Sequence, residues 1–207
     1  AACHGLRLVA FRDLAALGYN EAEVKAIAAG FQVPGIDPAT GEATTRPGLP
    51  TDNFPHAYAN DIAASAANNN AVPPDLSLIT KARPDGAAYL YSLLTGYSDQ
   101  PASLLAEFPD AKTPDGLYYN PYFHGLNLAM APPLTAEGQV TYSDGTRGTV
   151  DQMAKDVTAF LVWTAEPTME KRKQTGWPVL GFLLFATVLG YLSYRTIWAD
   201  KKKKKKA

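Results

Sequence analysis

The stretch Ala1-Ala2-Cys3-His4 matches the last four positions of Cys-x-x-Cys-His, the motif through which chains attach haem c. In that motif the cysteine thiols bind the porphyrin through thioether bonds, and the histidine is an axial ligand of the iron. Cys3 is therefore the candidate for covalent attachment of one haem c, and His4 is the candidate for the first iron ligand. The first cysteine of the motif is missing, so we expect either that the sequence starts one residue inside the motif or that a single thioether holds the haem.

Composition narrows the kinds of site that the chain can hold. Its 207 residues are 46% hydrophobic, which is enough for one sizeable core. Cys3 is the only cysteine, and this excludes intrachain disulfides as well as all-cysteine zinc or iron–sulfur centres. A haem anchor is the role that this pattern favours for the thiol.

Charge divides the sequence into an acidic head and a basic tail. Residues 1–170 carry 9 Lys and Arg against 19 Asp and Glu, a net charge of −10, whereas residues 171–207 carry 10 against 1, a net charge of +9. An acidic head repels phosphates, which argues against nucleic acid as a partner and favours a basic protein.

The tail contains a candidate membrane anchor. Residues 174–194 are 21 consecutive residues without a charge, or about 30 Å of helix, which matches the hydrocarbon thickness of a bilayer. Aromatic residues flank the stretch as they do at membrane interfaces: Trp177, Tyr191, Tyr194 and Trp198. Pro178 is expected in the first helical turn, where a missing N–H is tolerated.

We expect a single transmembrane helix over 174–198 and a basic tail over 199–207. Positive charges are more numerous after the span, at Arg195 and in the run 201–206, than before it, at 171–173. The positive-inside rule then places the tail in the cytoplasm and the haem domain, residues 1–170, on the periplasmic side of a bacterial inner membrane.

The head shows signals for three helices separated by long loops. Asn20 and Glu23 form a capping-box pattern before a helix over 21–29 that ends at Gly30, and a second helix is expected over 85–95. Thr149 is expected to cap a third helix that ends at 166–167, with Gln152 as its reciprocal partner and with a buried face made of Val150, Met153, Val157, Phe160 and Leu161. Residues 31–75 and 97–134 lack a sustained apolar period and are predicted to be irregular, and a short hairpin is predicted over 139–148. The fold class is therefore an all-α, c-type-cytochrome-like haem domain with long loops, in which haem replaces much of the core, plus the C-terminal transmembrane helix.

A second axial ligand must come from a methionine or another histidine. Met153 lies at a core position of the third helix, so packing explains it without a role as ligand. Met169 lies among charged residues near the membrane, which makes it a poor candidate. Met130 precedes two prolines that stiffen its loop, and His124 and His56 are the competitors. Methionine ligation would raise the reduction potential relative to bis-histidine ligation.

Several stretches, in order along the chain, resemble the cytochrome c₁ family, the haem subunits of quinol:cytochrome c oxidoreductase (the cytochrome bc₁ complex). They are Cys3-His4 followed by Val9-Ala-Phe-Arg-Asp-Leu14, then Ala67-Asn-Asn-Asn-Ala-Val-Pro-Pro-Asp-Leu-Ser77, Ser92-Leu-Leu-Thr-Gly-Tyr97, and Asn120-Pro-Tyr-Phe123 leading to Met130-Ala-Pro-Pro133. The resemblance covers nearly all of the 207 residues, although the helix that precedes the haem motif in that family is absent together with the first motif cysteine.

The resemblance implies further site residues. It implies Met130 as the sixth ligand, Arg83 as the partner of a haem propionate, Tyr89 as a donor on the propionate side, Asn68 as a polar contact at the haem edge, and Pro74 as a packing residue on the histidine side. The physical case for Arg83 is that a buried carboxylate needs a charge-assisted partner.

The function implied is one-electron transfer from the Rieske iron–sulfur protein, a 2Fe–2S protein, to a c-type cytochrome. Cytochrome b and the lipid bilayer would be further partners, within a dimeric and proton-translocating enzyme complex of the respiratory chain. Four acids before the Met130 loop are candidates for cytochrome docking: Asp99, Glu107, Asp110 and Asp115. The alternative functions are a stand-alone, membrane-tethered c-type cytochrome and a haem peroxidase, for which His124 would be a distal residue.

Overall fold

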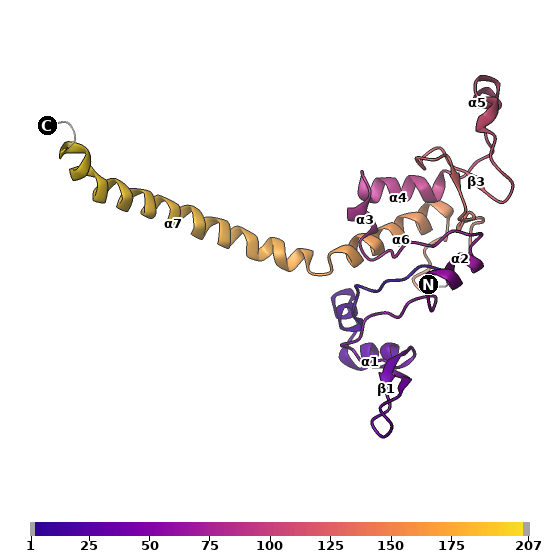
Figure 1. Cartoon of the computed structure of the whole chain (residues 1–207), viewed down its shortest axis with the longest axis horizontal. Coiled ribbons are helices and arrows are strands. Elements are labelled where there is room, and N and C mark those ends of the chain that lie inside the picture. The colour runs from indigo at the N-terminus through magenta and orange to yellow at the C-terminus, as the bar shows by residue number, and fades with distance from the viewer. Residues whose placement is uncertain (1–2, 205–207) are drawn as a thin grey trace. The chain divides into compact units, whose positions relative to one another are not determined.

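The protein is described by a computed structural model that covers the backbone of residues 3–204 and the side chains of residues 3–199. The chain forms two compact units, residues 1–167 and residues 168–207. The regular elements of the first unit are mostly short helices joined by long loops, and the second unit is built of one helix (Figure 1).

The N-terminal part of the first unit is built around three phenylalanines. The 3₁₀ helix η1 (Phe11–Leu17) contacts α1 (Glu21–Ala29), and Phe11 is completely buried. The ring centroid of Phe11 lies 5.2 Å from that of Phe31 and 4.4 Å from that of Phe54. The capping box at Asn20 and Glu23 is confirmed, because each side chain accepts a hydrogen bond from the backbone N–H of the other residue, and α1 ends at Gly30 as predicted.

A second group of helices packs around α6 (Val150–Ala165). The short α3 (Ile79–Ala82) and α4 (Gly86–Thr95) both contact α6, and Figure 1 shows α4 and α6 side by side. Ile79, Leu90 and Leu161 form their buried core. α6 also contributes Trp163 to the phenylalanine cluster, so this helix joins the two parts of the core.

Of the two reciprocal hydrogen bonds predicted at the start of α6, one is present and the other is not. The Thr149 side chain accepts from the Gln152 backbone N–H at 3.0 Å, but the Gln152 side chain donates to Asp156 instead of returning to Thr149. The buried face is also shifted, because Val157 is 37% exposed while Ala154, Thr158 and Thr164 are buried with Met153 and Leu161. Threonine is small enough to pack closely against a neighbouring helix although it is polar. A prediction of the buried face from apolar residues alone therefore omits it.

Two predictions of irregular structure need correction. Residues 31–75 contain an antiparallel hairpin, β1 (Gln32–Ile36) with β2 (Ala43–Pro47), and a helix, α2 (Asp61–Ala67). Residues 97–134 contain α5 (Ala102–Glu107), the 3₁₀ helix η2 (Pro109–Ala111), and the two-residue strands β3 (Tyr118–Tyr119) and β4 (Asn127–Leu128). The β1–β2 hairpin tolerates Pro34 because both strands of a two-stranded ribbon are edges.

The hairpin predicted over 139–148 is absent from the part of the chain that the structure describes. A turn forms at Asp144, but its flanks do not pair as strands. The two flanks share one backbone bond, from the Gly138 amide to the Gly148 carbonyl at 2.7 Å. The Tyr142 hydroxyl donates to Asp156, and the Gln139 side chain accepts from the amides of Thr135 and Ala136.

The second unit is α7 (Met169–Lys204), whose stretch Met169–Ala199 is the one helix in the described chain that is long and apolar enough to cross a membrane. Pro178 lies inside this helix, so its predicted place in the first turn is wrong. The helix begins about two turns earlier because the charged residues after Met169 are good helix formers.

Candidate functional site

The imidazole of His4 is held from one side. Its Nδ1 lies 2.8 Å from the carbonyl oxygen of Pro74, which is 70 residues further along the chain. Because a carbonyl can only accept, this contact places a proton on Nδ1 and leaves the lone pair of a neutral ring on Nε2. An imidazole oriented in this way is prepared to bind a metal through Nε2. Cys3, its neighbour, is an exposed free thiol.

The residues that follow His4 are fixed against the segment 50–54. The Phe11 amide donates to the Asp52 carbonyl at 3.0 Å, and the Phe54 amide donates to the Val9 carbonyl at 3.0 Å. The Asn53 side chain donates to the Arg7 carbonyl at 2.8 Å. These contacts connect the candidate attachment segment to the phenylalanine cluster.

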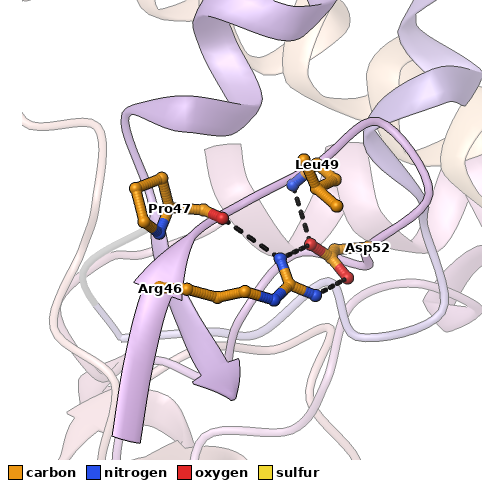
Figure 2. Close-up of polar contacts among 4 residues, drawn as sticks. All are labelled: Arg46, Pro47, Leu49 and Asp52. Carbon is orange, nitrogen blue, oxygen red and sulfur yellow. Dashed lines mark hydrogen bonds and ion pairs between the residues drawn. The ribbon is translucent and has the colours of Figure 1, made fainter. Parts of the chain in front are cut away.

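An ion pair shapes the segment 46–52, as Figure 2 shows. The Arg46 guanidinium bonds both oxygens of the Asp52 carboxylate, at 2.6 and 2.8 Å, and also donates to the Pro47 carbonyl. The Leu49 amide donates to the same carboxylate at 2.7 Å. The Arg46 side chain first, and the Leu49 amide next, lower the pKa of Asp52 from 3.8 to about 2. The carboxylate therefore stays charged down to low pH and keeps the loop closed.

Met130 lies in a bend that follows β4 and is partly buried. The Tyr97 hydroxyl donates to the Met130 carbonyl at 3.1 Å, which ties this loop to the end of α4. Burial raises the pKa of Tyr97 to about 12, so the hydroxyl keeps its proton and remains a donor. Further back in the same loop, Asn120 is completely buried and donates to the Leu93 carbonyl at 2.8 Å.

An open hollow of about 530 Å³ lies next to this loop. Polar and tyrosine side chains contribute most of its lining: Tyr97, Ser98, Asp99, Gln100, Thr113, Leu117, Tyr118, Tyr119 and Pro132. Tyr97 is the residue that connects the hollow to the backbone of Met130.

The other predicted pocket residues lie in different surroundings. Pro74 reaches His4 through its carbonyl. The Asn68 side chain donates to the Tyr58 hydroxyl and the Ala64 carbonyl, and Tyr89 packs on the core around Leu90. Arg83 is exposed, and its guanidinium donates to the Ala82 carbonyl at 3.2 Å without an ion pair among the described side chains.

The competing candidates for the sixth iron ligand differ in burial. Met153 is buried in α6 with 3% of its surface exposed, where it serves packing, and Met169 begins α7. His56 and His124 are both exposed.

The four candidate docking acids are all exposed and belong to the stretch 99–115, which includes α5 and η2. We refer to Asp99, Glu107, Asp110 and Asp115 together as the acidic loop.

Comparison with known proteins gives a consistent result. The model of the Cytochrome C1 family matches residues 1–201. The chain belongs to the cytochrome c₁ family. It is 45% identical to a protein named cytochrome c1 from Rhodospirillum rubrum, over 97% of this chain and 76% of that protein. It is 46% identical to a mitochondrial heme protein named cytochrome c1-2 from Solanum tuberosum, over 99% and 76%, and 43% identical to a cytochrome b/c1 from Bradyrhizobium diazoefficiens, over 97% of this chain and 31% of that protein.

The donor set of this cytochrome c₁ family member fits a covalently attached haem. A free thiol adjoins a histidine whose Nδ1 is already bonded, and a thioether is available at Met130, whose carbonyl is bonded by Tyr97 and whose loop is anchored ten residues earlier at Asn120. Soft sulfur and neutral imidazole are the ligands that such an iron takes.

Sequence reasoning missed the residues that position these ligands. Asp75 and Ser77 bond the segment after His4, and Asn120 anchors the loop of Met130. All three lie within stretches that carry the family resemblance, but nothing in their local pattern shows which distant groups they contact.

Proposed function

We propose that this chain is the one-electron carrier of a quinol:cytochrome c oxidoreductase, in which it passes electrons from the Rieske iron–sulfur protein to a c-type cytochrome. The observation that carries the proposal is the Cys3-His4 pair, with the His4 ring oriented by Pro74, in a chain of the cytochrome c₁ family. When bound, haem c supplies an iron that alternates between the ferric and ferrous states.

The residues present have distinct tasks in this proposal. Cys3 would hold the porphyrin covalently, His4 would offer Nε2 to the iron, and Met130 would offer its thioether on the other side. The Tyr97 hydroxyl holds the Met130 backbone, and its high pKa keeps that bond at all physiological pH values. Arg83 is an exposed cation available to a propionate, Tyr89 would donate on the propionate side, and Asn68 would be a polar contact at the haem edge.

The partners follow from the family and from the chain's charges. Cytochrome b would contact α7, since a relative combines the names of both cytochromes and α7 is apolar enough for a membrane. The excess of positive charge after the span supports a cytoplasmic C-terminus and a periplasmic haem domain in a bacterial inner membrane. The exposed acidic loop would face a basic cytochrome, and the complex would be dimeric.

Substitution of the proposed sixth ligand tests this function. Met130→Leu keeps the size and apolar character of the side chain but removes the sulfur, so the haem should stay attached while the reduction potential falls and the far-red band of thioether-ligated ferric haem disappears. Met153→Leu is the matched control, because it makes the same change at a buried packing position. A pyridine haemochrome spectrum of the parent protein distinguishes one thioether from two.

The outcomes separate the candidate functions. A Met130→Leu protein with an unchanged potential and band would refute Met130 as the ligand. A parent protein whose ferric haem binds azide or reacts rapidly with peroxide would instead support a peroxidase.

A further inference from the structure

Two segments about 70 residues apart are joined by a run of hydrogen bonds at the candidate attachment site. Besides the His4 contact with Pro74, the Leu76 amide donates to the Gly5 carbonyl at 2.9 Å. The Arg7 amide donates to Asp75 Oδ2 at 2.9 Å, and the Leu8 amide donates to the Ser77 hydroxyl oxygen at 3.1 Å. The backbone after His4 therefore lies against the backbone after Pro74, and two of the connecting groups are side chains.

Asp75 connects both segments with one carboxylate. Its Oδ1 accepts from the Ser77 amide at 2.9 Å, which fixes the turn that follows Pro74, while its Oδ2 holds Arg7. Burial alone would raise the pKa of Asp75, but the bonds from Ser77 and from the Arg7 amide outweigh it and lower that pKa. Ser77 is completely buried, so the hydroxyl that accepts from the Leu8 amide has no water as an alternative partner.

Gly5 shows how closely the two segments approach. A Cβ atom at Gly5 would lie 3.0 Å from Asp75 Oδ2, which is tighter than ordinary contact. The residue after His4 thus has to be small for the carboxylate to reach Arg7.

We propose that Asp75 and Ser77 are positioning residues that fix the rotation of the His4 ring by holding the Pro74 carbonyl and residues 5–8 in one frame. Pro74 cannot be held through its own amide because proline has no N–H, so the direction of its carbonyl depends on the turn that Asp75 closes. The Nδ1 partner of a metal-binding histidine sets the orientation and basicity of the ring, and movement of that partner changes the metal's properties. This inference rests on the proposed function, since the ring's rotation matters only if His4 is an iron ligand.

The test uses the full chain with haem attached, in Asp75→Asn and Ser77→Ala variants. The Asp75→Asn change keeps the size of the side chain but replaces one acceptor oxygen by a donor. The Ser77→Ala change removes the acceptor for Leu8 and the side-chain bond between Ser77 and Asp75, and it keeps the carboxylate. Asp144→Asn is the matched control, because Asp144 closes the same kind of turn, with its Oδ1 2.9 Å from the Thr146 amide, but has no bond to the His4 segment.

Two readouts are measured. Hydrogen–deuterium exchange of the peptide over residues 5–9 should accelerate at least about tenfold for the amide that loses its partner, in both variants and not in the control. The reduction potential and the electron paramagnetic resonance g values of the ferric protein should shift in both variants and stay unchanged in the control. A purely structural role would change exchange and thermal stability without moving the g values.

The outcomes are distinct. Faster exchange with parental g values and potential would overturn the positioning role, and so would parental exchange at residues 5–9. If Asp75→Asn does not fold, Ser77→Ala alone decides, since it leaves the carboxylate in place. A parent protein whose spectra show no histidine ligand would refute the proposed function itself, and the positioning role with it.

Discussion

Removal of the Asn120 side chain should loosen the loop that presents Met130. Asn120 is completely buried, and its Nδ2 donates to the Leu93 carbonyl at 2.8 Å while its Oδ1 accepts from the Tyr122 amide at 3.0 Å. Leu93 is one of the last four residues of α4, whose carbonyls have no partner inside the helix. Asn120 therefore acts as a side-chain cap for α4 and as a closure for its own turn.

The two bonds differ in what their loss would cost. The Leu93 carbonyl belongs to a buried residue, and an unpaired buried acceptor costs about 1–3 kcal/mol. The Tyr122 amide belongs to an exposed residue that water can reach, so its loss costs about 0.5–1 kcal/mol. Asn120→Ala should thus lower the free energy of unfolding of residues 1–167 by about 2–4 kcal/mol, including the small cavity left behind.

Denaturant titration of the detergent-solubilised chain, followed by near-ultraviolet circular dichroism, measures this loss. Asn53→Ala is the control, because Asn53 also donates to a backbone carbonyl at 2.8 Å but is exposed, so its loss should be about 0.5–1 kcal/mol. Asn120→Asp adds a sharper check, since an ionised carboxylate cannot donate to Leu93 and a protonated one can. Its stability should recover toward the parent as the pH falls. An Asn120→Ala loss no larger than that of Asn53→Ala would refute the capping argument.

Three further changes have defined outcomes. Arg46→Gln removes the main cause of the low pKa of Asp52. Because that pKa is depressed in the folded state, the stabilisation is present above about pH 4 and is lost at lower pH. In acid-unfolding curves the difference in stability between parent and variant should therefore close as the pH falls from 3.8 to about 2. Arg83→Gln should shift the reduction potential if Arg83 pairs with a propionate, whereas Arg147→Gln, which breaks an exposed pair with Glu137, should leave the potential unchanged. Neutralisation of the acidic loop should slow electron transfer to a basic cytochrome and weaken the dependence of its rate on ionic strength. Between about 0.01 and 0.15 M salt the Debye length shrinks from ~30 to ~8 Å, and a parent rate that stays constant over this range would contradict electrostatic docking.

The features that the sequence predicts well are those set by neighbouring residues. The capping box at Asn20, the end of α1 at Gly30 and the Thr149 cap depend on contacts three or four residues apart, and all are present. The long apolar helix after Pro167 is equally local, because a run of uncharged residues needs no partner to be recognised. The prediction that Pro178 lies in the first helical turn is wrong because the helix begins in a charged stretch, which a search for apolar residues does not detect.

The misread segments share a different cause. Residues 31–75 are rich in Gly and Pro, and these residues indicate turns without showing that two short strands can pair between them. The hairpin expected over 139–148 shows the converse error, because alternating residues around an Asp-Gly turn favour pairing only when no other partner competes. Tyr142 finds such a partner in Asp156 of α6, 14 residues away.

The sequence suggests candidate ligands but does not reveal the residues that support them, and the reason is physical. Cysteine, histidine and methionine are rare enough in this chain, at 1, 3 and 3 residues, that their chemistry selects them. Aspartate, serine and asparagine are common and mostly solvated, so only the folded structure shows that Asp75 and Ser77 face residues 68 and 69 positions away and that Asn120 faces one 27 positions away. Each of these bonds joins segments that are distant in the sequence and adjacent only in the folded structure. We therefore expect the ligands to tolerate little substitution because of their chemistry, and the supports to tolerate little because of geometry. The Asp75→Asn and Asp144→Asn pair tests the geometric cause, since both variants change the same residue type in the same kind of turn, and only Asp75 also holds a distant amide.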